Sequence, residues 1–156
     1  MYDIYDDELK EMYESKGKTG ITLDKGISPS DPLSTLTQGK FIVLNEQATL
    51  RNAIDSMQKY HIGCILLENN HKITGIFTER DIVQQIVGNR HNLEKEGVAN
   101  YMTKSPDVLH FQDPIAFALN KMISGGYRHI PIVNKEEEPI GIITMQDIIN
   151  HLGDYF

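Results

Sequence analysis

The stretch "GIITMQDIIN" at residues 141–150 contains a glycine, two apolar residues, Thr144 and Asp147, followed by another apolar run. Sixty-six residues earlier, residues 75–84 read "GIFTERDIVQ", with Thr78 and Asp81 in the corresponding places. Two copies of Gly-x-x-Thr-x-x-Asp in a chain of 156 residues predict an internal duplication.

The duplication extends from this motif toward the amino terminus. Apolar residues at relative positions 0, 3, 4 and 7 form one face of a helix. This spacing occurs twice, 65 residues apart, and predicts helices over 50–57 and 115–122. The residues that carry it are Leu50, Ala53, Ile54 and Met57, and then Ile115, Ala118, Leu119 and Met122.

Strand-like segments flank both helices in the same order, and each copy closes with a second helix, over 81–87 and over 147–152. Gly88 and Gly153 follow these helices at the position where glycine commonly ends one. The order is therefore β-α-β-β-α, stated twice. The strand candidates are "FIVL" (41–44), "CILLE" (64–68) and "ITGIF" (73–77), then "DVLHF" (107–111), "HIPIV" (129–133) and "PIGII" (139–143).

A unit of about 55 residues buries too little surface to be comfortably stable alone. The sequence thus predicts an α+β fold in which two β-α-β-β-α repeats pack sheet to sheet as one pseudo-symmetric module. We expect three segments: an acidic amino-terminal tail and linker (1–30), a first repeat (31–92) and a second repeat (93–156). Asp31 as N-cap and Pro32 as first helical residue predict a lead-in helix, and residues 89–106 resemble a linker. The tail has two open interpretations, a mobile segment or a partner-docking segment.

Composition narrows the class of protein. Hydrophobic residues make up 40% of the chain and charged residues 24%, as in soluble globular proteins. The apolar runs are too short to span a bilayer, and the acidic amino terminus does not resemble a leader. A single cysteine, Cys64, fits a reducing compartment, so we expect a cytoplasmic protein without membrane contact.

The net charge of −7 is concentrated at the start of the chain. Residues 1–14 carry −5, which leaves −2 for the remainder. The repeats have no basic face of the kind that nucleic acid binding requires, so nucleic acid is not an expected partner. A nearly neutral body does not repel a small anionic ligand.

The repeat, the two Gly-x-x-Thr-x-x-Asp motifs and "YRHIPIV" at residues 127–133 together resemble a tandem pair of cystathionine-β-synthase (CBS) domains, also called a Bateman module. The resemblance covers about residues 31–153. It implies a regulatory protein that requires no cofactor and binds an adenosyl ligand such as AMP, ADP, ATP or S-adenosylmethionine in clefts between the repeats. It also implies a disc-like homodimer, with a separate effector protein as the regulated target.

Thr144 and Asp147 have two interpretations that can coexist. A threonine followed three residues later by an acid is a capping box, which stabilises a helix start by about 1 kcal/mol. The same turn also suits a nucleotide, because threonine can donate to a phosphate oxygen and a carboxylate can accept hydrogen bonds from ribose hydroxyls. The resemblance assigns these two roles to the threonine and aspartate positions.

The second repeat supplies further candidates for a nucleotide site. Arg128 and His129 precede Ile130 and Pro131, and the resemblance places the arginine and histidine positions near ligand phosphates. Charge-assisted hydrogen bonds from arginine to phosphate are among the stronger polar contacts. Val108 and Ile130 are candidate walls for an adenine ring. The alternative for Arg128 is a surface residue at a strand start.

The first repeat departs from this pattern. Gly63 and Cys64 stand where Arg128 and His129 stand in the second repeat. Thr78, Asp81, Arg80 and Cys64 therefore form a second, weaker candidate site. Arg80 can meet a phosphate from the helix start or contact a partner subunit, and Cys64, in an apolar strand, is expected to be an inert core residue.

No catalytic or metal-ligating pattern is visible. The six histidines show no H-E-x-x-H or His-x-His spacing, and no phosphate-binding glycine loop occurs. We therefore predict no enzyme activity and no metal site. The predicted function is an adenosyl-ligand sensor, and the alternative is a ligand-free dimerisation or scaffold module in which both motifs act only as caps.

Overall fold

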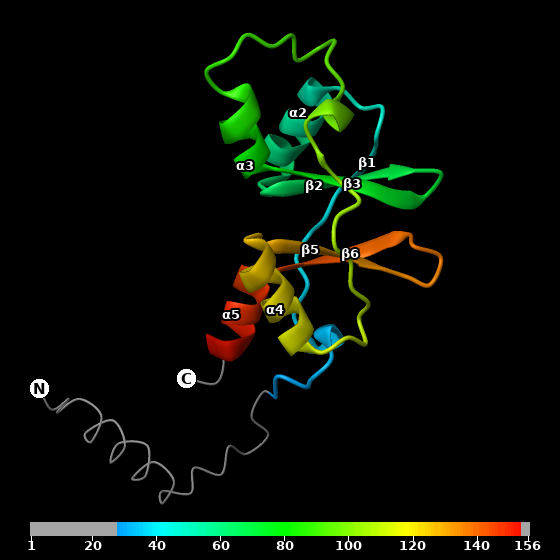
Figure 1. Cartoon of the computed structure of the whole chain (residues 1–156), viewed down its shortest axis with the longest axis vertical. Helices are drawn as coiled ribbons and strands as arrows, with labels where there is room; N and C mark the ends of the chain where they lie inside the picture. Colours follow the sequence, from blue (N-terminus) through cyan, green and yellow to red (C-terminus); the bar gives the residue numbers. More distant parts are fainter. Residues whose placement is uncertain (1–27, 154–156) are drawn as a thin grey trace, which may run out of the picture.

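The structure is a computed structural model that describes residues 28–153 (Figure 1). The predictions made for residues 1–27 lie outside the described range. The first repeat contains, in order, the 3₁₀ turn η1 (Leu33–Thr35), β1 (Val43–Asn45), α2 (Leu50–Tyr60), β2 (Cys64–Asn69), β3 (Lys72–Thr78), α3 (Glu79–Asp81) and the π-helical segment η2 (Ile82–Ile86).

The second repeat follows the same plan, but its own sheet has only the two strands β5 and β6. It contains the 3₁₀ turn η3 (Val98–Asn100), β4 (Thr103–Lys104), α4 (Ile115–Gly125), β5 (His129–Val133), β6 (Pro139–Thr144) and α5 (Met145–Gly153). The predicted strand over 107–111 is reduced to one parallel bridge, between Leu109 and Ile132. That bridge is equivalent to the pair Leu44 and Leu67, which joins β1 to β2 in the first repeat.

Both repeats place the Thr-x-x-Asp motif at the same point of the sheet. Strand β2 runs antiparallel to β3 and pairs Cys64 with Thr78. Strand β5 runs antiparallel to β6 and pairs His129 with Thr144. The duplicated sequence has therefore produced a duplicated register.

The two sheets face each other at the centre of the molecule, and helices cover their outer sides (Figure 1). Helices α2 and α3 lie over the sheet of the first repeat, and α4 and α5 lie over the β5–β6 hairpin. Alternation along β2 explains this layering, because successive side chains point to opposite faces. Cys64 and Leu66 join Ile76 and Ile142 between the sheets, whereas the intervening Ile65 packs with the helices of the first repeat.

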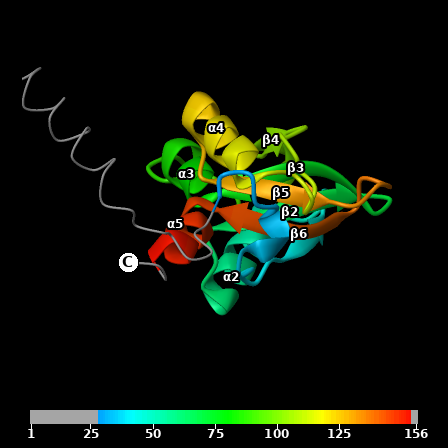
Figure 2. The ribbon, with the colours of Figure 1, turned by 90° about the horizontal axis from the view of Figure 1, so that it is seen from below.

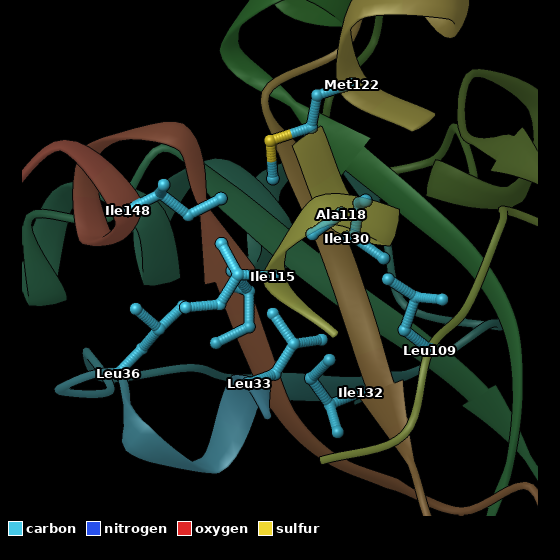
Figure 3. Close-up of a cluster of buried hydrophobic side chains, with 10 residues drawn as sticks. Leu33, Leu36, Leu109, Ile115, Ala118, Met122, Ile130, Ile132 and Ile148 are labelled. Atoms are coloured by element: carbon cyan, nitrogen blue, oxygen red, sulfur yellow. The ribbon is translucent and has the colours of Figure 1, made fainter. Parts of the chain in front are cut away.

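The helical faces predicted from spacing form the outer cores. Leu50, Ala53 and Met57 are buried on α2. The core of the second repeat also buries the chain before β1 (Figure 3). It consists of Leu33, Leu36, Leu109, Ile115, Ala118, Met122, Ile130, Ile132, Ile143 and Ile148.

The segment before each repeat pairs with the opposite half of the molecule. Pro32 forms a bridge with Pro114, before α4, while Gly97 forms the equivalent bridge with Thr49, before α2. Strand β4, within the predicted linker, adds to the first sheet beside β3. The expectation of a plain linker over 89–106 was therefore wrong, because this segment is part of the first repeat's core and sheet.

Two helix predictions need correction. The lead-in is a single 3₁₀ turn with Pro32 as its N-cap, and the Asp31 carboxylate accepts a hydrogen bond from the Ser28 amide at 2.8 Å instead of capping it. The helix predicted over 81–87 begins at Glu79 and continues as a π-helix from Ile82. Gly88 follows with a positive φ of 83°, as a glycine that ends a helix does.

The β2–β3 and β5–β6 hairpins extend in the same direction from the body (Figure 2). A backbone hydrogen bond of 3.1 Å from the Ile73 amide to the Glu137 carbonyl joins them. Within residues 28–153, none of the helices combines the length and the apolar character that crossing a bilayer demands.

Candidate ligand site between the two repeats

A cavity of about 620 Å³ lies where the start of α3, the closing helix of the first repeat, meets the start of β5 in the second repeat. Pockets of this size hold small organic ligands. Four segments contribute its walls: Gly63 directly before β2, the end of β3 with α3, the chain after η3, and the end of α4 with the start of β5. The lining residues are Gly63, Ile76, Thr78, Glu79, Arg80, Asp81, Thr103, Pro106, Asp107, Gly125, Gly126, Tyr127, Arg128 and His129.

The wall formed by the end of β3 and α3 contains a complete capping box, made by Thr78 and Asp81. The Thr78 amide and hydroxyl donate to Asp81 Oδ2 at 2.8 and 3.0 Å. The Asp81 amide donates back to Thr78 Oγ1 at 3.4 Å. These bonds hold both side chains at the N-terminus of α3, where they line the cavity.

The opposite wall depends on two glycines at the end of α4. Gly126 is the C-cap of α4 and has a positive φ of 69°, a conformation that glycine adopts without strain. The Tyr127 ring lies against the Cα of Gly125, so that a Cβ there would collide with the ring. Glycine at 125 is therefore what allows Tyr127 to line the cavity.

Arg80 connects the two walls. Its Nη1 donates to the Gly126 carbonyl oxygen at 2.8 Å, from the first repeat to the second within one chain. Figure 1 shows the start of α3 and the end of α4 facing each other at this point. This hydrogen bond joins the two repeats of one chain, so it is neither the phosphate contact nor the partner-subunit contact predicted for Arg80, and those two roles stay predictions.

His129 lies between the two motifs. Burial lowers its pKa, partly offset by the carboxylates of Glu79 and Asp147, and Arg128 lowers it further. The Gly63 Cα adjoins both the Glu79 carboxylate and the His129 ring. His129 is therefore neutral at pH 7, with donors and acceptors of both repeats around it.

Asp107 and Tyr127 form a polar pair on the cavity wall. The Tyr127 hydroxyl donates to Asp107 Oδ2, and Lys121 Nζ lies 3.7 Å from Asp107 Oδ1. Burial, followed by the hydrogen bond to Asp107, raises the pKa of Tyr127 to about 12. The Tyr127 hydroxyl therefore stays protonated, and its uncharged ring forms an apolar part of the cavity wall.

The structure divides the predicted site residues between two places. Arg128 and His129 line the cavity together with Thr78, Arg80 and Asp81, which we had predicted as a separate, weaker set. Thr144 and Asp147 form their own capping box, with the Thr144 amide donating to Asp147 Oδ2 at 2.7 Å, and they do not line this cavity. Contact of Thr144 and Asp147 with a ligand stays a prediction.

The predicted adenine walls lie beside the cavity and do not line it. Ile130 is fully buried in the core of the second repeat, because it alternates with His129 along β5 and points to the helices. Pro131 is also buried, and Val108 is half-buried directly after Asp107. Cys64 is buried between the sheets, and burial with the nearby Glu79 raises the pKa of its thiol to about 12, which confirms its core character.

Comparison with known proteins decides the family. The sequence profile of the CBS domain matches residues 29–88 and 98–154. The chain belongs to the CBS domain family. Its two matched segments are the two repeats, so the chain carries a CBS pair.

Related sequences occur in distant organisms. The CBS domain-containing protein CBSCBSPB5 of Arabidopsis thaliana is 32% identical over 142 residues, which is 90% of this chain and 25% of the plant protein. An uncharacterized 17.7 kDa protein of Acidianus ambivalens is 27% identical over 78% of this chain and 73% of its own length. The chain thus spans about a quarter of the plant relatives it matches first.

Solved CBS pairs share the fold. A CBS domain protein of Pyrobaculum aerophilum, solved in complex with AMP, is 26% identical with a TM-score of 0.68, covering 79% of this chain and 98% of its own. The CBS pair of protein MJ0100, solved with 5′-methylthioadenosine and S-adenosyl-L-methionine, has a TM-score of 0.72 at 22% identity, covering 82% of this chain and 100% of its own. The second likeness shows the fold alone.

Nine of the fourteen lining residues were not predicted from the sequence, among them Glu79, Asp107, Gly125 and Tyr127. The sequence-based prediction grouped its candidates by repeat, whereas the cavity takes each wall from a different repeat. The pattern that could have revealed this is the duplicated lead-in, because Leu33 and Val98 stand 65 residues apart and each is buried in the other half. Among residues 28–153, no cluster of three metal-ligating side chains occurs.

Proposed function

We propose that this CBS pair is a regulatory module that binds an adenosyl ligand, AMP in the first instance, in the cavity between its repeats. The observation that carries the proposal is the convergence of Thr78 and Asp81 with Arg128 and His129 on one cavity. Asp81 can accept hydrogen bonds from ribose hydroxyls, and Arg128 can donate to a phosphate. The AMP complex of the related Pyrobaculum aerophilum protein supports the choice of ligand.

The charges around the cavity favour a ligand with one phosphate. Arg80 and Arg128 supply two cations, while Glu79, Asp81 and Asp107 supply three carboxylates. Each further phosphate adds repulsion from these carboxylates without a new cation to meet it. We expect AMP to bind more tightly than ADP, and ADP more tightly than ATP.

A thermal-shift screen of the full chain tests the proposal. The panel contains AMP, ADP, ATP, NADH, S-adenosylmethionine and cyclic di-AMP. A ligand at a hundredfold excess over Kd stabilises the native state by about 2.7 kcal/mol, which corresponds to a rise of roughly 5–10 °C in Tm for a domain of this size. A concentration-dependent rise with AMP supports the sensor, and no shift with any compound, repeated by calorimetry, contradicts it.

The second candidate function is a ligand-free dimerisation module. Its supporting observation is that the side chains of each Thr-x-x-Asp turn already bond with the main-chain amides at the start of their own helix. In that case Thr78, Asp81, Thr144 and Asp147 serve only to start their helices. We expect no enzyme activity in either case, and any regulated partner would be a separate protein.

Dimerisation accompanies both candidates in our proposal. Val83 and Ile149 occupy equivalent positions 66 residues apart and are 67% and 52% exposed. Phe117 and Ile123 add exposed apolar side chains on α4. A second copy of the chain suits such a paired, apolar surface, since a two-fold interface uses the same patch on both subunits.

Light scattering after size exclusion measures the dimer directly. The full chain should have twice the monomer mass, and the double variant Val83→Lys with Ile149→Lys should have the monomer mass. A monomeric wild type, or a dimeric double variant, contradicts this interface. Substituting Lys59, which already lies at the surface of α2, by Glu is the matched control and should leave the dimer intact.

A further inference from the structure

We propose that Gln85 is a positioning residue, which holds the Asp81 carboxylate in place for a ribose hydroxyl and ties it to Tyr101 at the end of the lead-in to the second repeat. The inference rests on the proposed function, because it concerns the same cavity. It goes further in naming a residue outside the cavity wall and outside the Gly-x-x-Thr-x-x-Asp motif. Gln85 lies in the π-helical segment η2, four residues after Asp81.

The side-chain amide of Gln85 lies between two acceptors. Its Nε2 donates to Asp81 Oδ1 at 3.3 Å and to the Tyr101 carbonyl oxygen at 3.0 Å. The amide group has two N–H donors, one for each partner. The opposite orientation would place the amide oxygen against two oxygens that can only accept, so the contacts themselves determine which end faces Asp81.

The contacts leave Asp81 one direction in which to bind a ligand. Its Oδ2 already accepts the amide and hydroxyl of Thr78. Its Oδ1 accepts from Gln85, and a carboxylate oxygen has two acceptor positions. The remaining position on Oδ1 adjoins the cavity that Asp81 lines, where a ribose hydroxyl can donate to it.

Gln85 is itself anchored at both ends. Its main-chain carbonyl accepts from Asn89 Nδ2 at 3.3 Å, and His91 Nε2 lies 3.0 Å from the same oxygen, so that nitrogen is the one that carries a proton. Tyr101, at the other end, donates its hydroxyl to Glu96 Oε1 at 2.6 Å. The hydrogen bond from Tyr101 is the largest of the contributions that lower the pKa of Glu96, which keeps the acceptor ionised.

The Tyr101 ring also packs edge-on against His91, with centroids 5.4 Å apart and planes at 88°. The carbonyl oxygen that accepts from Gln85 therefore belongs to Tyr101, whose side chain is held by His91 and Glu96. Because Gln85 is exposed, solvent alone would not hold its amide toward Asp81. The second repeat has His151 at the equivalent position, so this amide is specific to the first motif.

The test is a calorimetric titration of the full chain with AMP and with 2′,3′-dideoxyadenosine 5′-monophosphate, which lacks both ribose hydroxyls. The variant Gln85→Met keeps the length of the side chain and removes its donor. The matched control is Gln84→Met, the neighbouring exposed glutamine on the same segment. A second variant, Gln85→Glu, sets a carboxylate against Asp81 in the same volume.

Wild type should prefer AMP to the dideoxy nucleotide. Gln85→Met should weaken AMP binding by about tenfold and leave the dideoxy nucleotide unchanged, so that the preference falls. Gln85→Glu should lower the same preference, and Gln84→Met should keep it. A purely structural role would weaken both nucleotides equally.

An unchanged preference in Gln85→Met, or an equal loss for both nucleotides, overturns the positioning role while leaving AMP binding by wild type intact. Failure of wild type to bind AMP overturns the proposed function itself, and this inference with it. The two failures are therefore distinguishable in one experiment.

Discussion

The two Thr-x-x-Asp turns share two internal hydrogen bonds, from the threonine amide to the carboxylate and from the aspartate amide to the threonine hydroxyl, but they have different surroundings. The threonine amide lies 2.8 Å from the aspartate Oδ2 in the first repeat and 2.7 Å in the second. Across the repeat boundary, the first turn faces Tyr127, Arg128 and the cavity, whereas the positions equivalent to these two residues in the other half are Ile62 and Gly63.

The comparison separates folding from binding. A capping box is needed wherever this strand passes into a helix, so both copies keep it. The strand start that faces the other repeat's turn carries Arg128 and His129 in the second repeat, and Gly63 and Cys64 in the first. The Thr78–Asp81 turn of the first repeat therefore faces Arg128 and His129, although the first repeat has no arginine or histidine at the equivalent positions.

The largest expected effect comes from exchanging the two aspartates for asparagine. Asp81→Asn should weaken AMP binding by about a hundredfold, because a charged acceptor for ribose hydroxyls is lost. Asp147→Asn should change the affinity by less than about threefold, because Asp147 lies off this cavity. Asparagine keeps an acceptor for the threonine amide in both variants. Calorimetry measures both, and equal losses would remove the distinction between the two turns.

Arg128→Gln should weaken AMP binding by roughly 10- to 100-fold and leave adenosine nearly unaffected, because the arginine meets only the phosphate. The matched control is Arg90→Gln, at an exposed arginine that does not line the cavity, and it should leave both affinities unchanged. Calorimetric titration with AMP and with adenosine separates contact with the phosphate from contact with the nucleoside. A similar loss for both ligands would show that Arg128 acts through the fold.

Gly125→Ala tests how the cavity wall is built. The added Cβ would meet the Tyr127 ring, so we expect a loss of about 1–3 kcal/mol in unfolding free energy, together with weaker AMP binding. Tyr60 occupies the equivalent position in the first repeat, which has no such requirement. Gly39→Ala, with nothing within 4 Å of the new Cβ, is the control for urea unfolding. An unchanged midpoint for Gly125→Ala would show that Tyr127 adapts freely.

The smallest effect concerns pH. Burial lowers the pKa of His129, so the imidazole binds no proton in the free protein at pH 7, and its contribution to stability is lost as pH falls below about 6.5. A phosphate held by Arg128 favours the imidazolium, so AMP binding takes up a proton. Affinity should therefore rise a few-fold, on the order of threefold, from pH 8 to pH 6.5. The rise should vanish in His129→Gln, and a rise that persists there would belong to another group.

Much of the fold was predictable because it depends on local periodicity. The spacing of Leu50, Ala53 and Met57, repeated in Ile115, Ala118 and Met122, identified both outer helices and their buried faces. Short apolar runs identified β2 and β5. These features depend on neighbours in sequence, which a single chain displays.

The pairing of the walls was not predictable from such patterns. Which repeat faces Arg128 depends on the two-fold packing of the sheets, and no residue near Arg128 in sequence reports it. The same holds for Gly125 and Tyr127, which matter only because α4 ends opposite α3. Ile130 was misplaced for a simpler reason, since it alternates with His129 and therefore lies on the helical face of β5.

A crystal structure of the full chain with AMP tests the central claim most directly, namely that the ligand site takes one wall from each repeat. We expect a ribose hydroxyl within hydrogen-bonding distance of Asp81 Oδ1 and the phosphate within the same distance of the Arg128 guanidinium. AMP bound with its ribose on Asp147 and its adenine beside Gly63, and with the Asp81 cavity holding only solvent, would contradict it.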